Sequence, residues 1–501
     1  MRGRMKVIAR LIAAGACTIA YCQLAWGIGT VELPVPSDPT VSFRIWFKVG
    51  SQDDPAGKEG LAALTADMVG DASTLQNSYD QILKKLYPMA AAYWASVDKE
   101  MTVIAGRVHR DHLNAYVDLL LQAITQPAFT AEDFQRHQTN VINYLDKALR
   151  YSNDEALGKE VLYAALFANS SYGHPEAGLL ASVRSITLED VKEFYRTHYT
   201  AGNVVIGIGG GYDPVLVDRL KTALSALPPG APLPVAKPAL PPLEGIKVVL
   251  VDKETQSTAI SIGFPINVLR GDRDFYALWI ANSWLGEHRN SSSHLYQVIR
   301  EARGMNYGDY SYIEYYPNGW RHQFPPPNSP RRQQFFEIWI RPVQNEAAQF
   351  AVRAAVQELQ RLIDNGMSPD EFSLTRKFLK KYVRHYAPTT DLRLGYKIDD
   401  AFYGIPDHLQ TAEKMFDELT LEDVNRAIRK HLQTSNMTIA MVTQNAQGMK
   451  QALASGAPSP MTYATPKPPE VLEADKVTAV YPLKILPEKV VVMPVDSTFI
   501  R

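Results

Sequence analysis

Thr187–Val191 (TLEDV) is repeated as Thr420–Val424 (TLEDV) in the second part of the chain. Two more residues return at the same offset after each copy, namely His198 and Asn203 after the first and His431 and Asn436 after the second. In both copies a threonine precedes two acidic residues and an apolar run, which is typical of a helix N-terminus. A short apolar run that favours a strand closes each copy, at 204–208 and 437–442. The chain therefore contains a duplicated unit.

The two copies are separated by a stretch of many prolines at 227–245, which predicts a stiff, extended linker. Strand patterns open the two halves, and long amphipathic stretches at 110–123 and 350–364 indicate helices. We expect an α+β fold with two homologous domains, each a mainly antiparallel sheet with helices packed on one face. The predicted boundaries are 28–226 for the first domain, 246–450 for the second, and 451–501 for an extended tail that contains prolines.

Composition describes an ordinary globular protein. The chain has 501 residues, 46% of them hydrophobic, and 52 Lys and Arg balance 53 Asp and Glu to give a net charge of -1. A balanced charge gives no global attraction to nucleic acid or to anionic membranes. After the leader, no apolar run reaches the ~20 residues of a membrane span.

The N-terminal segment 1–27 has the pattern of a secretory leader, with basic residues, an apolar run and then small residues. It predicts a periplasmic or secreted location if the host is bacterial. Cys17 follows small residues that faintly resemble a lipoprotein cleavage box, so a lipid anchor is the less favoured alternative. Both cysteines, Cys17 and Cys22, lie in this segment, which leaves none for disulfides in the folded part.

Gly50–Met68 (GSQDDPAGKEGLAALTADM) resembles the entry to the metal helix of the insulinase/pitrilysin family of zinc peptidases. In that family the helix carries H-x-x-E-H. The three positions are Ala63, Ala66 and Asp67 in this chain, so both imidazoles and the catalytic carboxylate are missing. The resemblance places Asp146, in the stretch 140–146, at or near the family's third ligand. A catalytic zinc site needs three protein ligands, so we expect no metal in this chain.

Asp67 and Asp146 leave one other possibility for a metal. Two carboxylates are suited to a hard cation such as calcium or magnesium, but these ions prefer six or more oxygens. We interpret the two residues as ordinary acidic side chains at a degenerate metal site.

The resemblance covers about 41–444 and implies two homologous domains that close around the substrate like a clamshell. The family's first strand-turn-strand is shortened between Val31 and Thr40. This departure leaves open whether the first sheet keeps its edge element.

Arg300 and Tyr307 have the spacing of an arginine and a tyrosine that hold the scissile carbonyl and the developing oxyanion in the family. A guanidinium and a phenol can donate preorganised hydrogen bonds to such a charge. The alternative is a surface ion pair for Arg300 and a tyrosine packed on a core. The surrounding sequence also resembles the family's segment and favours the functional interpretation. Arg303 is a substitute for Arg300 at the wrong spacing.

Trp94, Ala95 and Ser96 fall where the family adds its peptide substrate as a strand to the first sheet. Trp94 replaces the small polar residue usual in active members. Its bulk either fills the groove or belongs to a buried edge aromatic.

Other motifs are weaker. His109 and His112 are separated by three positions, but no third ligand accompanies them and a solvated turn is the simpler interpretation. Gly209–Gly211 lacks the residues that complete a phosphate-binding loop, and no Gly-x-Ser-x-Gly elbow occurs.

Together these observations predict that the parts of one peptidase site are shared between two different subunits. The chain resembles the subunit without zinc of a hetero-oligomeric insulinase-type metallopeptidase, which presents Arg300 and Tyr307 to a partner. That partner would be a homologue with the intact motif and bound zinc, and the substrates would be unfolded peptides. The alternative is a catalytically inactive structural or peptide-binding protein of the same fold.

Overall fold

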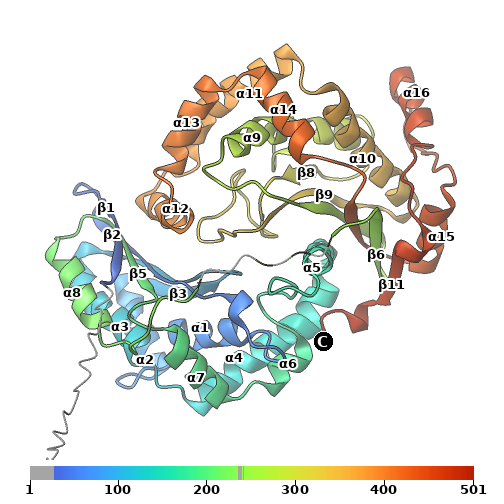
Figure 1. Ribbon diagram of the computed structural model, residues 1–501. Helices are drawn as coiled ribbons and strands as arrows, with labels where there is room; N and C mark the ends of the chain where they lie inside the picture. Colours follow the sequence, from blue (N-terminus) through green and yellow to red (C-terminus); the bar gives the residue numbers. More distant parts are fainter. Residues whose placement is uncertain (1–26, 235–237, 239, 241) are drawn as a thin grey trace, which may run out of the picture.

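The computed structural model describes residues 27–234, 238, 240 and 242–501, and Figure 1 shows two halves with α5 and α12 between them. The leader, including Cys17 and Cys22, lies outside the described residues apart from Gly27. Among the helices of the described part, none has the length and apolarity of a membrane span.

Each half is built on one mixed sheet in which antiparallel pairs predominate. The first has the order β1-β5-β2-β4-β3, and the second has the order β11-β6-β10-β7-β9-β8. The strands of the first are β1 (Gly29–Pro34), β2 (Thr40–Phe47), β3 (Ala92–Val97), β4 (Thr102–His109) and β5 (Val204–Gly210). Those of the second are β6 (Ile246–Asp252), β7 (Ser257–Ile266), β8 (Asp309–Tyr312), β9 (Gln334–Gln344), β10 (Met437–Thr443) and β11 (Val490–Pro494).

The first sheet keeps an edge element despite the shortened sequence. β1 pairs in parallel with β5 from Gly29 to Pro34, while the remaining pairs of this sheet are antiparallel. Pro34 lies at the end of an edge strand, where its missing amide breaks no ladder.

Helices cover the outer face of each sheet. In the first half they are α1 (Leu61–Gly70), α2 (Tyr79–Leu86), α3 (Leu113–Thr125), α4 (Ala131–Asn143), α6 (Leu180–Ser185), α7 (Leu188–His198) and α8 (Val215–Leu224), with α5 (Asp154–Leu166) set apart. In the second they are α9 (Arg273–Gly286), α10 (Ala348–Asn365), α11 (Pro369–Tyr382), α13 (His408–Glu418), α14 (Leu421–His431), α15 (Ala446–Ser455) and α16 (Pro469–Thr478), with α12 (Thr390–Tyr403) set apart.

The repeated sequence forms the starts of α7 and α14. Thr187 Oγ1 accepts a hydrogen bond from the Asp190 amide, and the Asp190 carboxylate accepts one from the Thr187 amide at 2.7 Å. Thr420 and Asp423 make the same reciprocal pair. The capping box therefore explains why the same five residues begin a helix in both halves.

The two halves exchange one helix each. α5 belongs to the first half in sequence but packs on β7 and β10 of the second sheet, and α12 of the second half packs on β1, β2 and β5. Ile398 and Phe402 of α12 join Trp46 of β2 in one buried cluster. Each inner sheet face is thus covered by a helix from the opposite half.

Buried ion pairs also join the halves. Arg331, which is 0% exposed, donates from Nε and Nη2 to the two carboxylate oxygens of Asp98 at 2.7 and 2.9 Å. Its Nη2 also donates to Glu176 at 3.0 Å. Lys159 of α5 lies 3.7 Å from Glu337 and 4.4 Å above the Trp339 ring.

The C-terminal segment contacts both halves. It contains α16 and then β11, which pairs in parallel with β6 of the second sheet. Beyond β11 the chain reaches the first half, where Arg150 donates to the Thr498 carbonyl at 3.1 Å and Leu180 donates its amide to the Phe499 carbonyl. The segment expected to be an extended tail therefore includes a helix and a strand and links the two halves.

Candidate functional site

The face of α1 that would hold a metal carries two methyl groups and one carboxylate. Asp54 fixes the start of this helix, because its carboxylate accepts from the amides of Gly60 and Ala62 at 2.7 Å each. Ala66 is fully buried, and loss of solvent raises the pKa of Asp67 to about 6. Alanine side chains at the two other positions cannot coordinate a cation.

His137 of α4 is a neighbour of Asp67 that the sequence analysis missed. Its Nδ1 lies 3.8 Å from Asp67 Oδ2, and its Nε2 is 2.9 Å from the backbone carbonyl of Asp71. These two side chains offer two ligands at most, whereas catalytic zinc needs three. Throughout the described part of the chain there is no group of three or more His, Cys, Asp or Glu that could hold a metal ion. The residues present do not fit the family's zinc.

Asp146 has cationic partners of its own. It lies in the π-helical segment η4 (Tyr144–Ser152), where its carboxylate is 2.9 Å from Arg150 and 3.2 Å from Lys147. Asp67, by contrast, faces His137. The structure shows no contact between these two carboxylates within the described residues.

Arg300 and Tyr307 lie on the wall of one cavity of about 720 Å³ in the second half. Arg300 is near the end of the π-helical segment η5 (Tyr296–Glu301), its side chain is 36% exposed, and it forms an ion pair with Glu301. Tyr307 is 80% exposed, so its ring is not packed on a core. Both side chains can therefore reach a molecule in this cavity.

A tight turn presents Tyr307. Asn306 Nδ2 donates to Asp309 at 2.8 Å and to the Arg341 carbonyl at 2.9 Å, and Asn306 Oδ1 accepts from the Gly308 amide. Burial raises the pKa of Asp309 to about 8. The residues on both sides of Tyr307 are thus fixed to the sheet while its side chain stays free.

Arg303 is not an alternative donor. Its side chain is buried, and Nε donates to Asp475 of α16 at 2.8 Å. The spacing argument against Arg303 agrees with this burial.

Trp94, Ala95 and Ser96 lie in β3, which has β4 as its single neighbour in the described sheet. Trp94 is opposite Ala105, a residue of the cluster under α12, so its side chain is on the inner face. It is 47% exposed and is therefore not a buried edge aromatic. An added strand would meet this indole directly.

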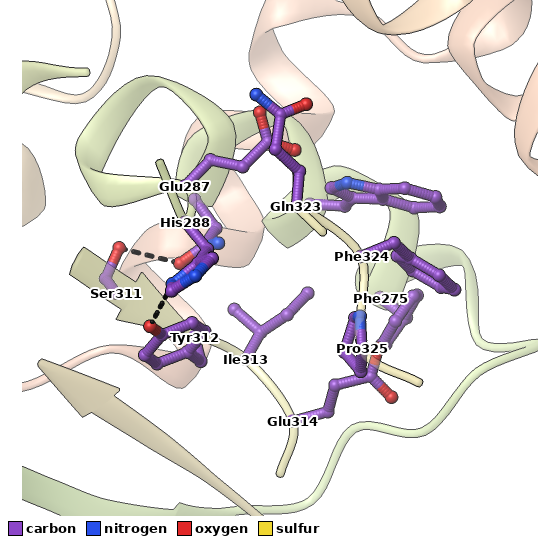
Figure 2. Close-up of a pocket in the computed structure, with 12 residues that line it drawn as sticks. Phe275, Glu287, His288, Ser311, Tyr312, Ile313, Glu314, Gln323, Phe324 and Pro325 are labelled. Carbon is purple, nitrogen blue, oxygen red and sulfur yellow. Dashed lines mark hydrogen bonds between the residues drawn. The ribbon is translucent and has the colours of Figure 1, made fainter. Parts of the chain in front are cut away.

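A small internal cavity in the second half is no candidate for peptide binding. Its volume is about 30 Å³, and Figure 2 shows His288 hydrogen-bonded to the Tyr312 hydroxyl on its wall. Burial lowers the pKa of His288 to about 3, so the imidazole is neutral. This volume is on the scale of ordered water molecules and is too small for a peptide.

The weaker motifs have local explanations. His109 ends β4 and pairs with Asp111 at 3.2 Å on the surface. At Gly210, with φ of 114°, a Cβ atom would lie 2.0 Å from the Thr40 carbonyl oxygen. The glycine run is therefore a close approach of two strands.

Two family models match the chain. The insulinase (peptidase family M16) model matches residues 31–178, and the model of the peptidase M16 inactive domain matches residues 185–379. The second description applies to the half that carries Arg300 and Tyr307.

The relatives include proteins named as zinc proteases and one named as a non-peptidase homologue. An uncharacterised zinc protease of Streptomyces coelicolor is 25% identical over 305 residues, which are 60% of this chain and 65% of that protein. A non-peptidase homologue of Helicobacter pylori, YmxG, is 21% identical over 415 residues, which are 81% of this chain and 89% of that protein.

Among solved structures, a peptidase M16 inactive domain from Pseudomonas fluorescens matches with a TM-score of 0.74 and 22% identity, over 84% of this chain and 96% of the other. A protease from Helicobacter pylori matches with a TM-score of 0.71 and 17% identity, over 84% and 98%. The two family models together match most of the chain, and the fold agrees with them in its two homologous halves. The chain belongs to the insulinase (peptidase M16) family.

Proposed function

We propose that this chain is the subunit without zinc of a hetero-oligomeric insulinase-type metallopeptidase. The observation that carries the proposal is that Arg300 and Tyr307 line one open cavity, while the metal positions of the same chain are Ala63, Ala66 and Asp67. A purely structural protein has no need of two exposed donors at this spacing. The zinc-bearing homologue would supply the metal and the general base.

The two side chains suit a developing oxyanion. The guanidinium of Arg300 offers several N–H donors in a planar fork, and the phenol of Tyr307 donates a single directed hydrogen bond. The ion pair of Arg300 with Glu301 is on the surface and stabilises little, so a substrate carbonyl can replace the carboxylate. Both donors then hold the carbonyl of an unfolded peptide while the partner attacks it.

The test is turnover of a quenched fluorescent peptide library by this chain mixed with a zinc-bearing family member encoded beside it. Arg300→Ala and Tyr307→Phe should each lower kcat by about 10²–10³-fold, as expected for loss of one oxyanion donor. Arg384→Ala is the matched control, because Arg384 is exposed on the surface with its own partner Glu413. Turnover by the Arg300→Ala complex at the rate of the Arg384→Ala complex would refute the proposal.

A second candidate is an inactive peptide-binding or structural protein. It is favoured by the likeness to the non-peptidase homologue and by Trp94 on the edge strand. If the mixture cleaves no peptide and this chain alone binds the same peptides, the second function would be established.

A further inference from the structure

The C-terminal segment lies directly behind the residues that present Arg300 and Tyr307. Arg303, Gly304 and Met305 form one side of a cavity of about 230 Å³, and Met461–Thr465 with Lys467 form another. Gly304 and Met305 also line the larger cavity with Arg300 and Tyr307. The stretch Arg303–Met305 therefore lies between the cavity that contains the proposed donors and the C-terminal segment.

A buried ion pair connects these two segments. Arg303 Nε donates to Asp475 Oδ1 at 2.8 Å, and Arg303 Nη1 donates to the carbonyl of Val298, within the segment η5 that carries Arg300, at 2.7 Å. Tyr463 donates its hydroxyl to the other carboxylate oxygen of Asp475 at 2.7 Å. The side chains of Arg303 and Asp475 are 5% and 10% exposed. Because this geometry satisfies both charged groups away from water, it fixes the position of each.

The C-terminal segment that carries Asp475 is itself held by α10 of the second half. Arg353 of α10 is buried and donates to Ser459 Oγ at 2.8 Å and to the Ala457 carbonyl at 2.8 Å. Thr478, at the end of α16, donates to Gln357 of α10 at 2.7 Å. α16 therefore packs against α10 (Figure 1) and forms a fixed support for Arg303.

We propose that Arg303 and Asp475 are positioning residues, through which the C-terminal segment sets the place of Arg300 and Tyr307. Neither residue touches the peptide. The pair holds η5 and the turn after it in place beside the cavity, so that the backbone carrying the two donors needs no rearrangement when the peptide binds. This inference rests on the proposed function for its effect on catalysis, and on the geometry alone for its effect on the segment.

Hydrogen exchange measured by mass spectrometry tests the support without any partner. In the full chain, Asp475→Asn removes the charge that holds Arg303, and exchange in peptides covering 298–308 should accelerate by at least about tenfold. Tyr463→Phe removes one hydrogen bond to the same carboxylate and should give a smaller acceleration, which keeps the test decisive if Asp475→Asn folds poorly. Glu473→Gln is the control on α16, since Glu473 is exposed and pairs only with Lys476 among the described contacts. Exchange equal to that of the control in both variants would overturn the inference.

Turnover with the zinc-bearing homologue tests the connection to catalysis. Asp475→Asn should lower kcat by about ten- to hundredfold and leave KM within about twofold, because misplaced donors weaken the transition state more than the bound peptide. Wild-type kcat for Asp475→Asn, beside a crippled Arg300→Ala complex, would overturn the positioning role and leave the proposed function standing. Wild-type kcat for Arg300→Ala would refute the proposed function instead, and hydrogen exchange would then decide the inference.

Discussion

Arg331→Met should loosen the join between the two halves. The substitution takes three charged hydrogen bonds from carboxylates of the first half, two from Asp98 and one from Glu176. Asp98 still accepts a hydrogen bond from the Lys99 amide at 2.7 Å, and Glu176 still forms an ion pair with the Lys99 ammonium at 3.0 Å. The two carboxylates therefore remain partly compensated. The guanidinium also lies 3.4 Å from the centroid of the Tyr315 ring, a contact that methionine replaces without its charge.

Breaking a buried ion pair by removal of one partner costs about 3–5 kcal/mol in free energy of unfolding, and we expect this range for Arg331→Met. The assay is urea unfolding followed by tryptophan fluorescence. Arg384→Met is the control, because its ion pair with Glu413 is on the surface, where the side chain of Arg384 is 73% exposed, and such pairs contribute about 0–1 kcal/mol. If Arg331→Met destabilises the protein no more than Arg384→Met does, the buried pairs do not hold the halves together. Adding Asp98→Asn to Arg331→Met should restore part of the lost free energy of unfolding, since it removes a buried carboxylate that has lost its cation.

Three further outcomes are expected. Asp309→Asn should raise the free energy of unfolding by about 4 kcal/mol at pH 7, because the pKa of Asp309 is about 8 when folded and 3.8 when unfolded. The stability of the wild type is therefore highest below the unfolded pKa and falls as the pH rises toward the folded pKa, so the difference between variant and wild type should narrow toward pH 4 in urea titrations. Lys159→Met leaves Glu337 buried without its cation, which raises the already elevated pKa of that carboxyl further; the deficit in unfolding free energy should be small below pH 4.5 and grow as the pH rises, and a deficit independent of pH would contradict this account. Removal of residues 495–501 takes the Thr498 carbonyl from the buried Arg150 and Phe499 from the core of the first half, and should cost about 3–5 kcal/mol in thermal or urea unfolding, whereas an unchanged midpoint would show that this end is dispensable.

The sequence predicted those parts of the fold whose signals are local. The capping boxes of α7 and α14 need only a threonine and an aspartate three positions later, so the repeated text located both helices and the duplication. The exposure of Tyr307 excludes a tyrosine packed on a core, whereas Arg300 forms the surface ion pair that the alternative interpretation describes. The role of the two residues stays a prediction.

What the sequence did not predict depends on tertiary contacts. Nothing in the pattern of Asp154–Leu166 says which of two sheets this helix covers, since its apolar face fits either. His137 comes beside Asp67 only through the packing of α4 on α1, and no spacing relates them. Arg303 and Arg300 have the same chemistry, and their separate roles follow from Asp475, far along the chain.

The exchange of α5 and α12 bears on the origin of the molecule. A single half, made alone, would expose the inner face of its sheet, with Ala440 and Val442 or Trp46 lacking the helix that belongs to its counterpart. Two copies of an ancestral half could satisfy each other by trading that helix, which is the geometry of a domain-swapped dimer. Joined by 227–245, such a dimer becomes one polypeptide in which the former subunits are free to diverge. On this view, the methyl groups that α1 carries at Ala63 and Ala66 belong to a half that no longer had to match its counterpart.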